Sequence, residues 1–495
     1  MRDLVRGTLL TWIGAGAALL AAVVRGKVFA VSLGPAGVGT VAQLTSFTTL
    51  VGTVGALGLG SAIAQQLARF RGLQVRDDER RVVQTAVLIS GLAGLALALC
   101  VVLGAGSLSR WLFGGDESLA WALQLLAIGV VFFSLGPNLQ AVFSGYGAAY
   151  QSSVTDVATA VITVCAVLLV VPRFGLRGAV VTLVLVAAAR AGIQTIGIAR
   201  VEPAALRGFP SAVDRRAIRS ILTTLLLIAA AGVALSVSDA GAQLYLRTRI
   251  IHLYGVESNG LYQAAFAAAN QVLTNGMSFV SAIAFARVNS SPTRALRTQA
   301  TNEAMRLALV ISVLGTCALI ALRDPYIHVL LSREFLPARE YFPLLAAGEA
   351  LKQLALTVGM GILTTAGLRP WLLQGLLWCG LNAGFAIVVL PLGPWALPLP
   401  YSLAAAGQFS VSWWMMAHFD GFQMSHRNAV LIGGGTVVVV AFAWLSDSLG
   451  GLVTGALLLS AWLWFAIGEY RRPLWGRVRR ALGLRDPEGT RGTGR

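Results

Sequence analysis

Apolar stretches of about 20 residues recur from one end of this 495-residue chain to the other, separated by short polar or charged segments. About 20 consecutive apolar residues are what an α-helix needs to cross the hydrocarbon core of a bilayer. Only 12% of the residues are charged, against about 25% in a soluble domain, so this chain lacks the polar surface that a soluble fold needs. The runs are too long for barrel strands and lack a two-residue alternation. The sequence therefore predicts an all-α polytopic membrane protein.

The apolar runs predict about fourteen transmembrane helices. The first run follows Arg2 and Arg6, as in a signal peptide, but it continues past the length of a signal h-region without a cleavage site. We therefore expect an uncleaved first span. The longest outward loop, 323–340, is expected to be an amphipathic interfacial segment. The expected spans are 7–33, 39–63, 82–106, 118–142, 153–171, 176–199, 220–250, 261–286, 304–322, 341–366, 370–391, 395–417, 428–446 and 451–470.

Positive charge sets the expected topology. With the amino terminus inside, the inward segments hold 26 of the 38 Lys and Arg residues and the outward loops hold 8. This is the positive-inside bias, and it predicts that both termini are cytoplasmic. The net charge of +17 is thus topological. A nucleic-acid site needs a concentrated basic face on a folded module, and no soluble segment is long enough to make one, so no nucleic-acid partner is expected.

Cysteine and histidine give no sign of a metal or cofactor. The four cysteines, Cys100, Cys165, Cys317 and Cys379, lie inside apolar runs and lack the spacing of metal ligands or of a disulfide framework. The four histidines lie near loops without metal-site spacing. We therefore predict neither a metal nor a cofactor.

Two stretches about 220 residues apart resemble each other. Residues 34–39 read Gly-Pro-Ala-Gly-Val-Gly and residues 255–260 read Gly-Val-Glu-Ser-Asn-Gly, and each precedes a span that ends in Ser-Ala-Ile-Ala. Each repeat holds six spans, an even number, so both copies enter the membrane from the same face. This predicts two parallel lobes related by a pseudo-two-fold axis along the membrane normal. The expected parts are an N-lobe (1–200, spans 1–6), a cytoplasmic linker (201–219), a C-lobe (220–417, spans 7–12), spans 13–14 (418–470) and a basic cytoplasmic tail (471–495).

Charges inside spans are the candidate functional residues, because they are costly in a membrane and usually functional. An offset of 220 pairs Lys27 with Arg247. Two cations at equivalent positions would suit an anionic headgroup in a central lumen. Alternatively, both side chains reach lipid headgroups at the outer membrane surface. Arg25 has no symmetric partner and lies about 200° from Lys27 around the helix, so the two do not face one cavity. Glu349 and Lys352 form an i,i+3 pair that is either a tuned substrate cation or a neutralised structural pair.

The remaining intramembrane charges leave two interpretations open. Arg190 is either a lumen cation or is paired between helices, with Asp156 as a candidate partner. Asp239, Gln243 and Arg247 follow at four-residue steps, so they form a polar stripe that is expected to face the lumen. Asp239, Glu349 and Asp156 are candidates to carry a coupling proton or to pair with a cation, and a hydrogen-bonded structural acid is the alternative for Asp156.

Several stretches resemble the Wzx-type flippases of the multidrug/oligosaccharidyl-lipid/polysaccharide (MOP) exporter superfamily, and within it the lipid III flippases. They are residues 27–39, 322–324, 330–335 and 348–352. The resemblance implies a flippase that moves an undecaprenyl-diphosphate-linked oligosaccharide, an O-antigen or common-antigen repeat unit, from the inner to the outer leaflet of the bacterial inner membrane. It implies alternating access through a cationic cavity, with the basic positions of the family at Lys27, Arg247 and Lys352.

The same resemblance implies the partners. They are the lipid-linked oligosaccharide and membrane lipids, with a polysaccharide polymerase and chain-length machinery as further candidates. The alternative is another MOP exporter, a multidrug antiporter or a lipid II flippase; the predominance of basic over acidic charges within the spans favours an anionic substrate. An enzyme such as a membrane glycosyltransferase is not expected, because no outward loop is long and no paired carboxylates stand ready for acid–base work.

Overall fold

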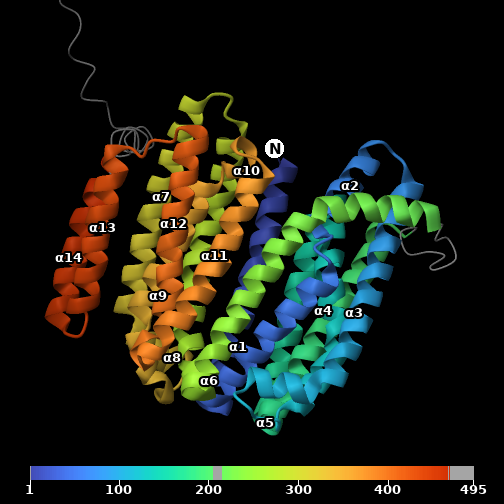
Figure 1. Cartoon of the computed structure of the whole chain (residues 1–495), viewed down its shortest axis with the longest axis horizontal. Helices are drawn as coiled ribbons and strands as arrows, with labels where there is room; N and C mark the ends of the chain where they lie inside the picture. The colour runs from blue at the N-terminus through green and yellow to red at the C-terminus, as the bar shows by residue number, and fades with distance from the viewer. Residues whose placement is uncertain (1, 204–214, 467, 469–495) are drawn as a thin grey trace, which may run out of the picture. The chain divides into compact units, whose positions relative to one another are not determined.

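The computed structural model describes residues 2–203, 215–466 and 468, and every regular element in them is a helix (Figure 1). This confirms the all-α prediction. The elements, with 3₁₀ helices written η, are α1 (Arg2–Ala56), α2 (Gly60–Gly72), α3 (Arg76–Leu112), α4 (Ala120–Tyr146), α5 (Ala149–Val201), α6 (Arg215–Ser290), α7 (Arg294–Ala321), α8 (Arg323–Leu330), η1 (Arg333–Glu340), α9 (Phe342–Gly359), α10 (Ile362–Thr365), α11 (Leu368–Val389), η2 (Leu390–Leu392), η3 (Pro394–Ala396), α12 (Leu399–Asp420), α13 (His426–Leu445) and α14 (Leu449–Ala466).

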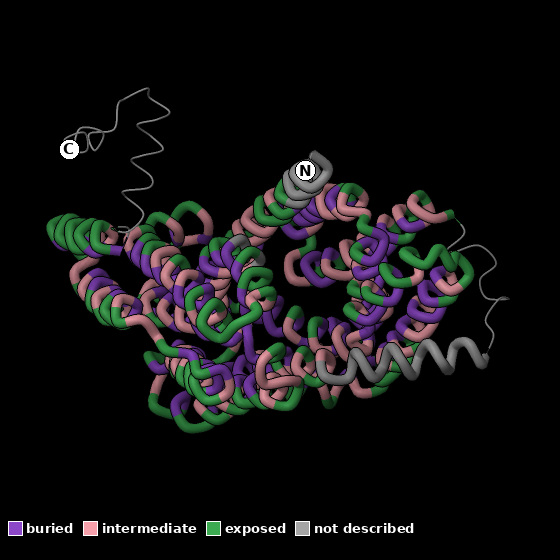
Figure 2. The backbone as a smooth tube through the Cα atoms, turned by 90° about the horizontal axis from the view of Figure 1, so that it is seen from above, coloured by how far each residue is buried: buried purple, intermediate pink, exposed green. Residues whose placement is uncertain are grey.

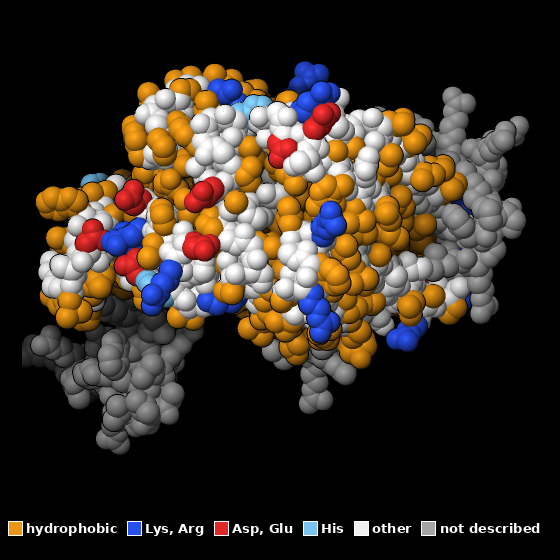
Figure 3. Space-filling model, turned by 90° about the horizontal axis from the view of Figure 1, so that it is seen from below, with side chains coloured by type: hydrophobic (Ala, Val, Ile, Leu, Met, Phe, Trp, Pro, Cys, Tyr) orange, Lys and Arg blue, Asp and Glu red, His pale blue; other side chains and the backbone are white. Residues whose placement is uncertain are grey.

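The helices present apolar side chains to their surroundings. Within the described residues, eight helices are long and apolar enough to cross a membrane. Large residues such as Leu103 and Trp444 are exposed, and Figure 3 shows many hydrophobic side chains on the surface of the face seen from below. A helix pairs its own backbone N–H and C=O groups, as the hydrocarbon region demands. The chain is therefore a multi-pass membrane protein, while the number of fourteen spans stays a prediction.

Three of the longest helices are broken by a glycine. Gly34 in α1, Gly175 in α5 and Gly255 in α6 have φ values of 63°, 54° and 83°, a region that residues with a Cβ rarely adopt. Each break divides one continuous helix into two segments. The breaks at Gly34 and Gly255 fall at the two turns that the internal repeat predicts, and the break at Gly175 falls between the fifth and sixth predicted spans.

The second predicted span, 39–63, ends earlier than expected. Helix α1 stops at Ala56 because Leu57 and Gly58 both adopt positive φ. A separate helix, α2, then begins at Gly60 and carries Arg69 and Arg71 in its last turn. The apolar run therefore continues through a turn that its composition does not reveal.

The chain forms two compact units. Unit 1 comprises Met1–Ala267, Asp324–Tyr341 and Leu368–Gly407, and unit 2 comprises Ala268–Arg323, Phe342–Gly367 and Gln408–Arg495. Both units draw on the predicted C-lobe, so the lobe boundaries remain a prediction. Residues 204–214 of the predicted linker and all of the predicted tail, 471–495, lie outside the described residues.

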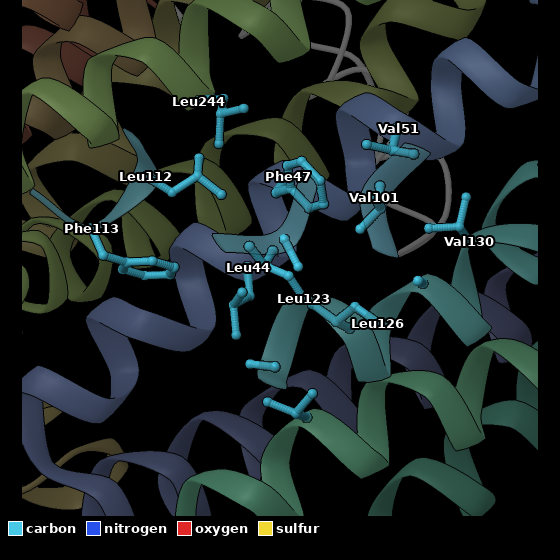
Figure 4. Packing of buried hydrophobic residues seen from close by; sticks show 14 of the residues in the cluster. Leu44, Phe47, Val51, Val101, Leu112, Phe113, Leu123, Leu126, Val130 and Leu244 are labelled. Atoms are coloured by element: carbon cyan, nitrogen blue, oxygen red, sulfur yellow. The ribbon is translucent and has the colours of Figure 1, made fainter. Parts of the chain in front are cut away.

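The first part of unit 1 is a bundle of α1, α3, α4 and α5. In Figure 2, buried residues face neighbouring helices and exposed residues gather on the sides without a neighbour. One core cluster joins Leu44 and Phe47 of α1 to Val101 of α3 and to Leu123 and Leu126 of α4 (Figure 4). Lipid tails are as apolar as these side chains, so close packing rather than escape from water holds such helices together.

Unit 2 contains α7, α9, α13 and α14, and a polar cluster fastens α13 to α7. The Ser425 side chain caps α13 by accepting a hydrogen bond from the backbone N–H of Asn428 at 3.2 Å. The Asn428 side-chain amide in turn donates to Oδ1 of Asn302, on α7, at 3.0 Å. These bonds fix where the α13–α14 hairpin begins.

Candidate functional site

Unit 1 contains a cavity of about 460 Å³ lined by α1, α4 and α5, which we call the N-terminal cavity. Pockets that bind small molecules typically measure about 300–1,000 Å³. Two arginines and a set of threonines dominate its polar lining. Its lining residues are Arg25, Phe29, Thr45, Thr48, Thr49, Gly52, Thr53, Phe132, Phe133, Gly136, Pro137, Gln140, Thr159, Thr163, Thr182, Leu183, Val186, Ala187 and Arg190.

Arg25 and Arg190 are the charged groups of the lining, and they differ in what they contact. Arg190 Nη2 lies 3.2 Å from Oδ1 of Asp156, so the interhelical pair that the sequence left open is present, here between the two halves of α5. Within the described part of the chain, Arg25 has neither a hydrogen bond nor an ion pair. A half-buried guanidinium without a counterion, inside an apolar bundle, is an attractive position for an anion.

Lys27 does not line this cavity. Its ammonium donates to the backbone carbonyl of Leu331 at 2.5 Å and to that of His328 at 3.4 Å. Both carbonyls belong to the last turn of α8 or follow it, where helix carbonyls lack backbone partners and favour a cation. The side chain therefore ties the α8–η1 segment to α1 within unit 1.

Arg247 is enclosed in the core of unit 1. Its side chain is 4% exposed, and its guanidinium carbon lies 5.7 Å from the ring centre of Tyr262 and 5.6 Å from that of Phe266. Nη2 donates to Oε1 of Gln263, while Nε and Nη1 have no partner among the described residues. The aromatic faces stabilise the charge.

The glycine breaks correct the expected pairing of Lys27 with Arg247. Gly34 and Gly255 are 221 residues apart, whereas the two cations are 220 apart. Lys27 is therefore equivalent to Thr248, and one residue of offset is about 100° around a helix. The glycine breaks thus shift the alignment by one position from the predicted pairing, and the two cations lie in different surroundings.

The intramembrane acids lie in separate places. Asp239, on α6, is exposed and accepts a hydrogen bond from the indole N–H of Trp378, on α11, at 2.8 Å. In unit 2, Glu349 is fully buried and accepts hydrogen bonds from Thr274 at 3.0 Å and from Gln353 at 2.7 Å. Lys352 follows Glu349 on α9 and is half-buried.

The structure thus places Arg25 and Arg190 on one cavity, with Asp156 paired to Arg190 behind the lining, and places Lys27 and Arg247 elsewhere in unit 1. The threonine lining was not predicted. A signal for it exists: Thr45, Thr49 and Thr53 follow at four-residue steps, which places them on one helix face.

The sequence has recognisable relatives. Residues 4–288, more than half of the chain, match the family described as "Polysaccharide biosynthesis protein". The chain is 23% identical over 414 residues to the lipid III flippases of Escherichia coli (strain K12) and Shigella flexneri, a match that covers 81% of this chain and 92% of each relative.

Solved structures share the fold. The lipid II flippase MurJ in an inward closed conformation superposes with a TM-score of 0.69 at 14% identity, covering 95% of this chain and all of that one. An inward-facing multidrug resistance MATE family transporter of the MOP superfamily gives 0.66 at 14% identity, covering 83% of this chain and 98% of that one. The fold is therefore that of the MOP transporters.

Proposed function

Because the chain belongs to the polysaccharide biosynthesis protein family, we propose that it is a flippase for an undecaprenyl-diphosphate-linked oligosaccharide, an O-antigen or common-antigen repeat unit. It moves this lipid from the inner to the outer leaflet by alternating access through a cationic cavity. The likeness to the lipid III flippases over most of the chain supports this substrate class.

The observation that carries the proposal is Arg25 in the N-terminal cavity. Its guanidinium is half-buried, lines the cavity and, among the described residues, has no counterion. Guanidinium groups bind phosphate oxygens through two parallel hydrogen bonds, and such charge-assisted bonds are stronger where water is scarce. Arg190, on the same cavity, supplies a second cation. A diphosphate fits this pair of charges.

The lining argues against an exporter of organic cations. No acid is among the lining residues of the cavity, all of which lie in the described part of the chain, and Asp156 already pairs with Arg190. A lipid II flippase would share the diphosphate, so only the glycan separates that alternative from the proposed function.

We further propose the bacterial inner membrane as the location, with both termini in the cytoplasm. The excess of Lys and Arg in the inward segments supports this orientation. A lipid-linked repeat unit delivered to the outer leaflet is the substrate that a polysaccharide polymerase and its chain-length machinery would take up. These proteins are the proposed partners.

Transport of a defined undecaprenyl-diphosphate oligosaccharide in proteoliposomes tests the proposal. The Arg25→Gln variant should lose about tenfold or more of the rate, because a hydrogen bond to a charged group contributes about 1.5–3 kcal/mol. Arg177→Gln, an exposed arginine of α5 outside the cavity, is the matched control and should transport normally. Full activity in Arg25→Gln, or export of cationic drugs with no glycolipid transport by the wild type, would refute the proposal.

A further inference from the structure

We propose that the N-terminal cavity recognises the junction between the diphosphate and the first sugar, with its threonines selecting a group that donates hydrogen bonds. This inference rests on the proposed function. Seven threonines from α1 and α5 face the same space as Arg25 and Arg190: Thr45, Thr48, Thr49, Thr53, Thr159, Thr163 and Thr182.

Most of these hydroxyl hydrogens are already used. Thr45 donates to the carbonyl of Val41 at 2.7 Å, and Thr49 and Thr53 donate in the same way one and two turns further along α1. Thr48, Thr163 and Thr182 also donate to carbonyls of their own helices, at 2.7–2.9 Å. A hydroxyl has one hydrogen and two acceptor lone pairs. These six oxygens therefore present only acceptors to the cavity.

Thr159 is different, because its hydroxyl is unsatisfied. The residue lines the cavity and is 9% exposed, while its Oγ1 is buried in the wall and has no hydrogen-bond partner among the described residues. A buried polar atom without a partner costs free energy that a bound ligand can recover. Thr159 is on α5, four residues before Thr163, so the two hydroxyls are neighbours on one helix face.

Gln140 extends the same acceptor character to α4. Its side-chain nitrogen donates to Ser152 at 2.7 Å, and its side-chain oxygen accepts from Gln194 at 3.1 Å. A carboxamide oxygen has two lone pairs, so it can accept one further hydrogen bond from a ligand.

The cavity thus offers two complementary kinds of group. Arg25 and Arg190 only donate, which matches phosphate oxygens that only accept. The threonine hydroxyls mainly accept, which matches sugar hydroxyls or an acetamido N–H. A bare diphosphate would leave the threonines without donors, and an organic cation would be repelled by the arginines. A ligand with phosphate oxygens beside hydroxyl donors satisfies both, and a glycosyl diphosphate is such a ligand.

The test compares two probes on the purified full-length protein in nanodiscs: undecaprenyl diphosphate and undecaprenyl diphosphate carrying N-acetylglucosamine. The wild type should bind the sugar-bearing probe about tenfold more tightly. In Thr159→Val and Thr163→Val this preference should fall by about twofold to tenfold per hydroxyl, the value of one hydrogen bond. The Kd for undecaprenyl diphosphate should stay unchanged.

Two controls separate recognition from folding. Thr40→Val removes a buried hydroxyl of α1 that donates to the carbonyl of Ala36 at 3.0 Å and lies outside the lining, so the preference should persist. Thr159→Ser keeps the hydroxyl that Thr159→Val removes, so this variant should retain the preference for the sugar-bearing probe.

The outcomes distinguish the two proposals. Equal binding of both probes by the wild type, or an unchanged preference in the valine variants, would overturn this inference and leave the flippase proposal standing. Binding of neither probe would overturn both.

Discussion

Gly39 of α1 and Gly260 of α6 lie against each other, backbone to backbone, within unit 1. A Cβ on Gly39 would lie 2.0 Å from the carbonyl oxygen of Val256, and a Cβ on Gly260 would lie 1.9 Å from that of Pro35. The contact is reciprocal, because Gly39 and Pro35 precede Gly260 and Val256 by the same 221 residues. The two copies of the repeated turn therefore meet through a local two-fold relation, as an isologous interface does.

Replacing Gly260 by alanine should damage this crossing. The added methyl group meets backbone rather than a movable side chain, so the helices must separate, at a cost of about 1–3 kcal/mol. We expect a lower melting temperature and reduced transport. Gly241→Ala on the same helix is the control, because nothing lies within 4 Å of its added methyl group. Equal stability of the two variants would contradict the close contact.

Lys27 should act on the α8–η1 segment rather than on substrate. Lys27→Met removes the hydrogen bonds to the carbonyls of Leu331 and His328 while keeping the apolar stem of the side chain. Amide hydrogen exchange over 324–341 should therefore accelerate. Arg333→Met, an exposed cation of η1, is the control and should leave exchange unchanged. Normal exchange with weakened binding of a diphosphate lipid would instead make Lys27 a substrate residue.

The ion pair between Arg297 and Asp420 should contribute strongly to the stability of unit 2. Arg297 donates from Nη2 and Nε to the two carboxylate oxygens, at 2.6 and 3.1 Å, and Asp420 is only 2% exposed. Asp420→Asn weakens this bidentate pair and should cost about 3 kcal/mol, visible as a lower melting temperature. Arg294→Gln, whose guanidinium is 4.0 Å from the same carboxylate and largely exposed, should cost under about 1 kcal/mol. A similar loss in both variants would refute this ranking.

The fold class could be predicted from the sequence because it depends on the length and composition of the apolar runs. The turns at Gly34 and Gly255 were predictable for a related reason, since glycine at a repeated position marks a backbone that needs positive φ. The break after Ala56 was not predictable. Leu57 adopts positive φ inside an apolar run, where the residue types do not mark a turn.

The site was predicted in kind but not in arrangement. A charged residue within a span indicates a functional candidate. The direction in which its side chain points, however, depends on the rotation of the helix that carries it. Lys27 was favoured over Arg25 because an offset of 220 paired it with Arg247, whereas the glycine breaks set the offset at 221. Arg25, which that pairing left aside, lines the N-terminal cavity. The repeat therefore did not identify the cation of the cavity, because the rotation of α1 and not the internal symmetry decides which side chain faces it.

Asp156 should restrain Arg190 until an anion takes its place. The two side chains are partly exposed and 3.2 Å apart, so the pair contributes at most about 1 kcal/mol. Asp156→Asn leaves the guanidinium without its counterion and free to bind phosphate. Binding of undecaprenyl diphosphate should therefore tighten by up to about fivefold, the equivalent of that free energy.

Asp116→Asn, in the α3–α4 loop outside the cavity, is the control for the change in charge and should leave the Kd unaltered. Arg190→Gln in the same assay should weaken binding, because the second cation is then lost. Weaker binding in Asp156→Asn as well would assign the carboxylate a different role: holding Arg190 in the orientation that meets the diphosphate.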